Sequence, residues 1–361
     1  MSGPKPRANI LEITPYVGGQ KPKSGWKLSS NENPLGCSAA AQKALLDASQ
    51  NLAEYPDGSA TELRLALADK YGIDAERIIC GAGSDEIFQL LARAYLEPGD
   101  EILQSAHGFL IYQLAAQQAG ASTVMAPERD FTTDVDALLK RVTERTKIVF
   151  IANPNNPTGT YLPFDEVRRL HAGLPEHVIL VLDGAYAEYV RRNDYSAGME
   201  LAGEAPNVLM TRTFSKIHGL AALRLGWAYG AASIIDALHR TRGPFNVSAV
   251  AQAAGIAALA DDSFQAKSAE LNAVELQRVV NALEAIGLEA VPSVANFILI
   301  KFPDQNGLSA TDADRFLREH GIIARDVDVY GLPNCLRLSI GIPKANDDVI
   351  ATFQSFLQRE L

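Results

Sequence analysis

Cysteine is scarce in this chain of 361 residues, which holds only three. Cys37, Cys80 and Cys335 stand singly, without a C-x-x-C pair or the dense, even spacing of a disulfide framework. This pattern excludes a disulfide-stapled scaffold and a cysteine-based zinc site, and the six histidines are scattered as well, so we predict no metal centre. Unpaired cysteines are typical of a reducing compartment, and we expect the protein in the cytoplasm.

Positive charge is also in short supply. Lysine and arginine total 33 against 43 aspartate and glutamate residues, a formal net charge of -10, and no segment gathers basic residues into a nucleic-acid footprint. No apolar run approaches the roughly 18 residues that cross a bilayer, and the polar N-terminus lacks a signal-peptide core. We therefore expect neither nucleic acid nor membrane as a partner, whereas one or two well-placed arginines still allow a small anionic ligand.

The chain does have enough apolar residues, 47%, to bury a large core, and its length suggests roughly two domains. Between residues 36 and 229, amphipathic helical patterns alternate with short apolar runs, which is typical of a parallel sheet covered on both faces. We predict an α/β fold with a mostly parallel central sheet. Its strands are expected at Arg77–Cys80, Glu101–Gln104, Ser122–Ala126, Lys147–Ala152, Val178–Leu182, Val208–Thr211 and Arg224–Tyr229.

The pattern changes after Tyr229. A helix-rich tract covers 248–286, strands are expected at 296–302, 322–325 and 335–340, and helices near 312–319 and from 346 onward. These features indicate a smaller C-terminal α/β domain. The first thirty or so residues are rich in proline and glycine, which leaves little room for regular structure. We predict an N-terminal arm (1–35), a large domain (36–245) and a small C-terminal domain (246–361).

Two turns at strand ends are candidate ligand sites. Residues 81–86, Gly-Ala-Gly-Ser-Asp-Glu, lead from a strand into a helix start, where free backbone N–H groups attract phosphate. Residues 153–159, Asn-Pro-Asn-Asn-Pro-Thr-Gly, follow another strand at the edge where open α/β sheets bind ligands. Each segment can also be a simple connecting turn. A dinucleotide site would need Gly-x-Gly-x-x-Gly, which Glu86 interrupts.

Three charged residues lie at the ends of predicted buried strands, where an unpaired charge is costly. Asp183 ends a buried strand, where a carboxylate needs a cationic partner such as a pyridinium nitrogen or a metal ion, although no histidine or cysteine nearby supports the metal. Lys216 follows a strand among hydroxyl and small apolar residues, a setting that suits an amine attacking a carbonyl. Arg224 starts the next strand and needs an anion. Together with the two turns, these residues offer the groups that pyridoxal phosphate requires.

The chain resembles the histidinol-phosphate aminotransferases, within the fold type I aminotransferases. The resemblance runs from Ser29-Ser30-Asn31-Glu32-Asn33-Pro34-Leu35-Gly36 to Leu336-Arg337. It implies that Lys216 carries pyridoxal phosphate as a Schiff base and acts as general acid and base. The catalytic residues it implies are Lys216, Asp183 and Tyr186, and the cofactor contacts are Tyr55, Ser84, Asp85, Phe109, Asn156, Asp183, Tyr186, Thr213, Ser215, Lys216 and Arg224.

The resemblance also implies individual roles. Asp183 would keep the pyridine nitrogen protonated, Asn156 and Tyr186 would bond the ring's phenolic oxygen, and Phe109 would stack on the ring. The phosphate would lie on the helix start with Arg224 beside it. Tyr55 would reach the phosphate of a neighbouring subunit, which implies a homodimer.

For substrates, the resemblance implies that Arg337 binds an α-carboxylate, and that Tyr16 and Arg325 bind a substrate phosphate. Three positions depart from the family's commonest pattern. Gly184 stands where glutamate usually follows the aspartate, Ala222 replaces a glycine, and Phe109 replaces a tyrosine. The missing phenol at Phe109 keeps open a preference for aromatic amino acids.

The predicted reaction is therefore transamination between histidinol phosphate and 2-oxoglutarate, in histidine biosynthesis and with ping-pong kinetics. The first alternative is a phenylalanine or tyrosine aminotransferase. A phosphate-ester amino acid decarboxylase of the same fold would keep every cofactor residue. A nicotinamide dehydrogenase lacks its glycine pattern, and a ligand sensor would need a DNA-binding segment that the N-terminal arm does not supply.

Overall fold

The computed structural model describes residues 3–15, 22, 24–305 and 307–360. A sheet in the order β2-β10-β9-β8-β7-β3-β4 forms its larger part. β10 runs antiparallel to β2 and β9, whereas the remaining neighbours pair in parallel. The strands are β2 (Ile78–Gly81), β3 (Glu101–Ser105), β4 (Ser122–Ala126), β7 (Thr146–Ala152), β8 (Ile179–Asp183), β9 (Val208–Thr213) and β10 (Gly226–Gly230).

Alternate residues of these strands supply two separate cores, because successive side chains point to opposite faces of a sheet. In β8, Leu180 and Leu182 belong to one core, and Ile179 and Val181 to the other. The first face is covered by α2 (Ala39–Ala48), α3 (Thr61–Tyr71), α6 (Val135–Leu139), α7 (Phe164–Gly173), α8 (Met199–Glu204) and α10 (Ala249–Ala260). The second face is covered by α4 (Ser84–Tyr95), α5 (Leu110–Ala119) and α9 (Ala232–Thr241).

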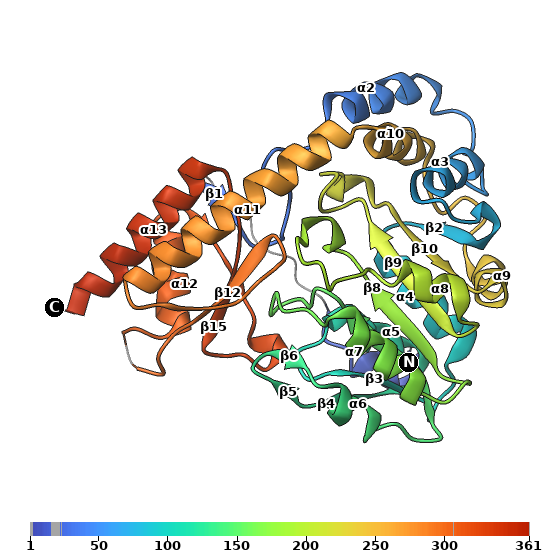
Figure 1. The fold of residues 1–361 in the computed structure, drawn as a ribbon, viewed down its shortest axis with the longest axis horizontal. Coiled ribbons are helices and arrows are strands. Elements are labelled where there is room, and N and C mark those ends of the chain that lie inside the picture. The colour runs from blue at the N-terminus through green and yellow to red at the C-terminus, as the bar shows by residue number, and fades with distance from the viewer. Residues whose placement is uncertain (1–2, 16–21, 23, 306, 361) are drawn as a thin grey trace.

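A second, antiparallel sheet has the order β11-β12-β15-β14. Its strands are β11 (Glu289–Val291), β12 (Phe297–Lys301), β14 (Arg325–Asp326) and β15 (Cys335–Ser339). Apolar residues of α11 (Asp262–Ala285), α12 (Ala310–Glu319) and α13 (Pro343–Leu357) pack on it. Figure 1 shows α11 running from the large sheet's helices to the small sheet, so it bridges the two parts.

The α/β fold predicted from the sequence is confirmed, and each predicted strand of the large sheet is present. The division at residues 35 and 245 stays a prediction, and α10, beyond residue 245, packs on α2 and α3 of the large part. Shorter elements complete the described chain: β5 (Glu128–Arg129), β6 (Thr132–Thr133) and β13 (Ile322–Ile323), and the 3-10 helices η1 (Ser49–Asn51), η2 (Ala75–Arg77), η3 (Ala187–Tyr189), η4 (Ala221–Leu223), η5 (Asp328–Tyr330) and η6 (Gln358–Glu360).

The first thirty residues are expected to have little regular structure, and the part of them that the structure describes contains two short elements. Helix α1 (Ala8–Leu11) lies against α5, and strand β1 (Trp26–Lys27) pairs in parallel with β13. The partner strand lies some 300 residues away in the chain, and such distant pairing leaves no local pattern. Within the described ranges, no helix is both long and apolar enough to cross a membrane.

Candidate active site

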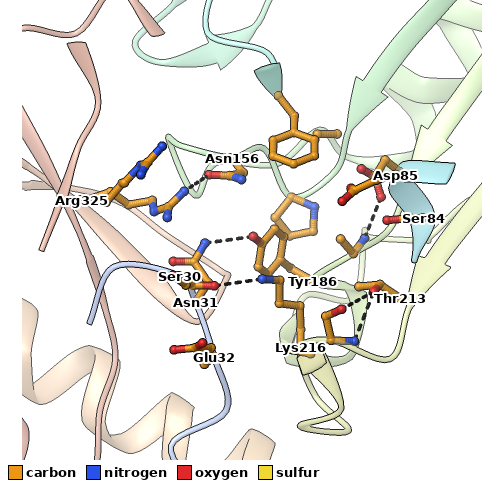
Figure 2. A pocket seen from close by; sticks show the side chains of 18 of the residues that line it. Ser30, Asn31, Glu32, Ser84, Asp85, Asn156, Tyr186, Thr213, Lys216 and Arg325 are labelled. Carbon is orange, nitrogen blue, oxygen red and sulfur yellow. Dashed lines mark hydrogen bonds between the residues drawn. The ribbon is translucent and has the colours of Figure 1, made fainter. Parts of the chain in front are cut away.

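A pocket lies between the two sheets, at the carboxyl ends of β7, β8 and β9. Ligands bind at this edge in open α/β sheets. Figure 2 shows Lys216 and Tyr186 at its centre, with Ser84, Asp85 and Thr213 on one side and Arg325 and Asn31 on the other. The structure brings most of the predicted site residues into this one pocket: Ser84, Asp85, Phe109, Asn156, Asp183, Tyr186, Thr213, Ser215, Lys216, Arg224, Arg325 and Arg337.

Asp183 ends β8 and is almost completely buried. Its carboxylate accepts hydrogen bonds from the Tyr112 hydroxyl at 2.6 Å, the Thr211 hydroxyl at 3.2 Å and the Ala185 backbone N–H at 3.2 Å. Burial raises the pKa of Asp183 to about 6, and the bonds from Tyr112 and Thr211 oppose that rise. The carboxylate is thus held ready for a cationic partner in the pocket.

Lys216 follows β9 and projects into the pocket, where Nζ donates to the Ser30 carbonyl oxygen at 3.0 Å. Burial, followed by the nearby Arg337 cation, lowers the pKa of Lys216 to about 8. A larger fraction of this amine is therefore unprotonated near neutral pH than of an ordinary lysine. An unprotonated amine is the form that attacks carbonyl carbon.

An anion cradle lies at the N-terminus of α4. Gly83 precedes the helix with φ +83°, and a side chain there would meet Arg224, whose Nη2 lies 2.4 Å from the position of its Cβ. Arg224 itself has φ +51°, a costly conformation for a residue with a side chain. Its guanidinium contacts Asp85 at 3.1 Å and Ser215 Oγ at 3.4 Å. Backbone N–H groups, hydroxyls and a guanidinium thus converge where a phosphate fits.

Tyr186 and Asn156 line the wall opposite that cradle. The Tyr186 oxygen accepts from Asn31 Nδ2 at 2.9 Å, so the phenol proton remains available for donation into the pocket. Burial raises the pKa of Tyr186 to about 12, so this proton is retained. Asn156 Oδ1 accepts from Arg337 Nη1, and Arg337 Nη2 donates to the Ser29 carbonyl oxygen at 2.7 Å.

Two arginines of the small sheet face the pocket together. Arg325 of β14 pairs directly with Arg337 of β15 in the antiparallel ladder. Residues directly opposite in a ladder share one face, so both guanidiniums lie on the pocket side. Two planar cations at one wall suit a doubly charged anion or two carboxylates.

One predicted contact residue lies outside the pocket, and another is not among the described residues. Tyr55 is outside the pocket, with 81% of its surface exposed, and its ring stacks on Phe245 at 4.5 Å. Tyr16 lies outside the described residues, so its predicted phosphate contact stays a prediction.

Sequence reasoning missed several residues of the site. Residues 29–32 line the pocket, although they were assigned to the arm. Their order, Ser-Ser-Asn-Glu before Asn-Pro, was noted only as part of the family resemblance. Tyr112 and Tyr330 were missed as well, and the apolar period of α5 gave no sign that a buried phenol would meet Asp183.

Comparison with known proteins agrees with this geometry. The family model "Aminotransferase class I and II" matches residues 23–353, nearly the whole chain. Fold and site thus define an aminotransferase of class I and II.

Full-length relatives narrow the class. The histidinol-phosphate aminotransferase of Maricaulis maris is 53% identical over 358 residues, covering 98% of this chain and 99% of the relative, and that of Rhodopseudomonas palustris (strain HaA2) is 50% identical over 364 residues, covering 99% and 100%. The crystal structure of the Sinorhizobium meliloti histidinol-phosphate aminotransferase in complex with pyridoxal-5'-phosphate superposes with a TM-score of 0.91 at 28% identity, covering 100% of this chain and 99% of that one. The chain belongs to the histidinol-phosphate aminotransferase family, as the resemblance predicted.

Proposed function

We propose that the protein transfers an amino group between histidinol phosphate and 2-oxoglutarate, with pyridoxal phosphate as cofactor, as a step of histidine biosynthesis. The observation that carries the proposal is the convergence of Lys216, Asp183 and the two arginines Arg325 and Arg337 in one pocket. The names of the full-length relatives support it, and they do not favour the aromatic amino acid alternative.

The residues present fit the cofactor. Asp183 would pair with the ring nitrogen, Tyr186 and Asn156 would bond the phenolic oxygen, and Phe109 would cover a ring face. The cradle formed by Ser84, Asp85, Thr213, Ser215 and Arg224 would hold the phosphate. The close approach of the Arg224 guanidinium to Gly83 at the start of α4 supports this assignment.

Pyridoxal phosphate supplies an aldehyde that condenses with amines and a ring that withdraws electrons from the substrate's α-carbon. Asp183 increases that withdrawal by keeping its charge beside the ring nitrogen. The fixed hydrogen bonds from Tyr112 and Thr211 aim its carboxylate. We assign Asp183 to electrostatic stabilisation and not to proton transfer at carbon.

Lys216 would act twice. Its amine would hold the cofactor's aldehyde carbon; once free, the same amine would take a proton from the substrate's α-carbon as general base and return one as general acid. A pKa of about 8 suits both directions near neutral pH, because neither form of the amine is rare there. Two half-reactions on one lysine predict ping-pong kinetics.

Arg325 and Arg337 would recognise the substrates. Histidinol phosphate has a phosphate and no α-carboxylate, whereas glutamate has two carboxylates. We assign Arg325 to the phosphate or the distal carboxylate, together with Tyr16, and Arg337 to the α-carboxylate. The pairing of Arg325 with Arg337 across β14 and β15 supports this division of roles, because both cations lie on the same face of the small sheet.

The proposal includes a homodimer. Tyr55 and Phe245 form an exposed aromatic pair outside their own chain's pocket, as expected for a contact with a second subunit. We also propose a cytoplasmic location, which the unpaired cysteines favour.

The test is to incubate the cofactor-loaded protein with histidinol phosphate and 2-oxoglutarate and to measure glutamate and the keto product. Equal amounts of both products are expected. Absence of both glutamate and the keto product of histidinol phosphate would overturn the proposal.

A further inference from the structure

His107 joins the two parts of the molecule beside the pocket. It lies between β3 and α5 of the large part, and its Nδ1 is 2.6 Å from the backbone carbonyl oxygen of Tyr330, in η5 of the small part. Tyr330 lines the pocket, five residues after Arg325. The two residues are 223 positions apart in the chain, so only the fold brings them together.

The direction of this hydrogen bond follows from chemistry. A carbonyl oxygen can only accept, so Nδ1 of His107 carries the proton and donates. Donation from Nδ1 is possible for both the neutral and the protonated ring, so the contact does not depend on the charge of the histidine.

His107 is also tied to the cofactor side of the pocket. Its own carbonyl oxygen accepts from Asn155 Nδ2 at 3.2 Å, next to Asn156, and its backbone N–H donates to Glu128 at 3.2 Å. Phe109, which lines the pocket, follows two residues later. His107 thus contacts both the turn that carries Asn156 and the turn that follows Arg325.

Apolar contacts surround this bond. Leu110 and Phe131 of the large part pack against a cluster that contains Val327, Tyr330 and Leu332 of the small part. The His107 ring lies against Phe131 at 6.4 Å between ring centroids. Figure 1 shows the β5–β6 hairpin, which carries Phe131, beside the small sheet. Apolar packing supplies contact area, but it is non-directional, and the hydrogen bond sets the position of the turn.

We propose that His107 is a positioning residue that holds the 325–330 segment against the large domain, and thereby sets the place of Arg325 relative to the cofactor wall. It touches neither substrate nor cofactor in this proposal. The effect on substrate affinity rests on the proposed function, whereas the effect on the η5 segment does not.

Two substitutions separate the hydrogen bond from the packing. His107→Phe keeps an aromatic ring and removes the donor. His107→Asn restores a donor, because the amide nitrogen and Nδ1 are both bonded to Cγ and reach the same place. His177→Phe is the matched control, since His177 is exposed and precedes β8 at the end of the sheet opposite the pocket.

The first measurement is hydrogen–deuterium exchange of the backbone amides of 325–331 in the cofactor-loaded protein without substrate. His107→Phe is expected to exchange several-fold faster there, because a lost contact lowers the free energy of local opening. His107→Asn and His177→Phe are expected to match the wild type. The second measurement is KM for histidinol phosphate, expected to rise about five- to tenfold in His107→Phe with kcat changed less than about twofold, as for one lost hydrogen bond.

Wild-type exchange and KM in His107→Phe would overturn the inference, and so would equal defects in His107→Phe and His107→Asn. If the wild type does not accept histidinol phosphate, the proposed function fails, and the exchange comparison alone then decides the role of His107.

Discussion

At the scale of single residues, Asp183 is proposed to supply the electrostatic part of the mechanism, and its charge depends on its neighbours. Tyr112 from α5 and Thr211 from β9 donate to it, while Asp85 from α4 and burial act against ionisation. Tyr112 is fully buried and stacks on Phe150 at 4.4 Å, so its hydroxyl has a fixed direction. The phenol therefore both aims the carboxylate and stabilises its anion.

Tyr112→Phe is expected to raise the pKa of Asp183 above its value of about 6, because the anion loses a donor. Asp183 is ionised above its pKa, so the variant must lose more cofactor affinity at pH 6 than at pH 8. A lost bond to a charged group corresponds to about one to two pKa units. The measurement is the dissociation constant of pyridoxal phosphate from the apoprotein at both pH values.

The control for this prediction is Tyr161→Phe, which removes a similar hydroxyl–carboxylate bond, to Asp194 at 2.9 Å, on the surface. An equal loss of cofactor affinity at the two pH values in Tyr112→Phe would show that the Tyr112 hydroxyl does not act by stabilising the Asp183 anion.

Lys216 has a lowered pKa of about 8, and this predicts how the apoprotein captures its cofactor. Only the unprotonated amine attacks, so the rate of covalent attachment should rise with pH to a midpoint near 8, against about 10.4 for an ordinary lysine. The rate is followed by the change of the cofactor's absorbance. Lys216→Ala should bind the cofactor without covalent attachment and show negligible transamination. The control is Lys344→Ala, which changes an exposed lysine and should behave as wild type.

Appreciable transamination by Lys216→Ala would remove that residue from the mechanism.

Sequence reasoning found Lys216 and Asp183 because each places a charge at the end of an apolar strand, where burying a charge without a partner is costly. It missed Asn31, because the partners of this residue lie far away in the sequence. Its backbone N–H and side chain form hydrogen bonds with Ser339, and its side chain orients Tyr186.

At the scale of elements, the register of two short strands builds the substrate wall. β14 has only two residues, yet its pairing with β15 puts Arg325 opposite Arg337. Long apolar strands such as β7 and β8 were predictable from composition. The two- and three-residue strands β1, β5, β6 and β11 were not, because so few residues carry no period and tertiary pairing decides them.

Arg325→Ala tests this wall. With histidinol phosphate as donor, kcat/KM of the first half-reaction should fall roughly tenfold to hundredfold, the loss expected for a charged hydrogen-bond partner. Phenylalanine, which lacks a phosphate, should lose less than about threefold. The measurement is made in a single turnover without 2-oxoglutarate. The proposed contact of Arg325 with the distal carboxylate of that acceptor then cannot affect the result.

Arg315→Ala is the control, because Arg315 is an exposed residue of α12. Equal losses for histidinol phosphate and phenylalanine in Arg325→Ala would refute a phosphate-binding role.

At the scale of the whole molecule, the proposed function includes a dimer in which Tyr55 of each subunit completes the site of the other. The fold class, and the meeting of the predicted cofactor residues in one pocket, followed from the order of strands and turns along the chain. The position of Tyr55 relative to a second subunit does not follow from one chain, because its partner surface belongs to another copy.

Subunit mixing tests the shared site. Tyr55→Ala retains Lys216, and Lys216→Ala retains Tyr55, so each homodimer lacks one group in both sites. A mixed dimer contains one site with both groups. Mixing the two variants after subunit exchange should therefore raise the activity at low cofactor concentration well above the sum of the separate activities. Activity equal to that sum would contradict a site shared between subunits.

The central claim is the identity of the amino donor, and competition tests it most directly. The cofactor-loaded protein receives equimolar histidinol phosphate and phenylalanine with limiting 2-oxoglutarate, and the ratio of the two keto products gives the ratio of their kcat/KM values. A large excess of the product from histidinol phosphate is predicted, because Arg325 faces the pocket and is assigned to the phosphate group, which phenylalanine lacks. An excess of phenylpyruvate would leave the fold, the cofactor and Lys216 in place and contradict the assigned substrate.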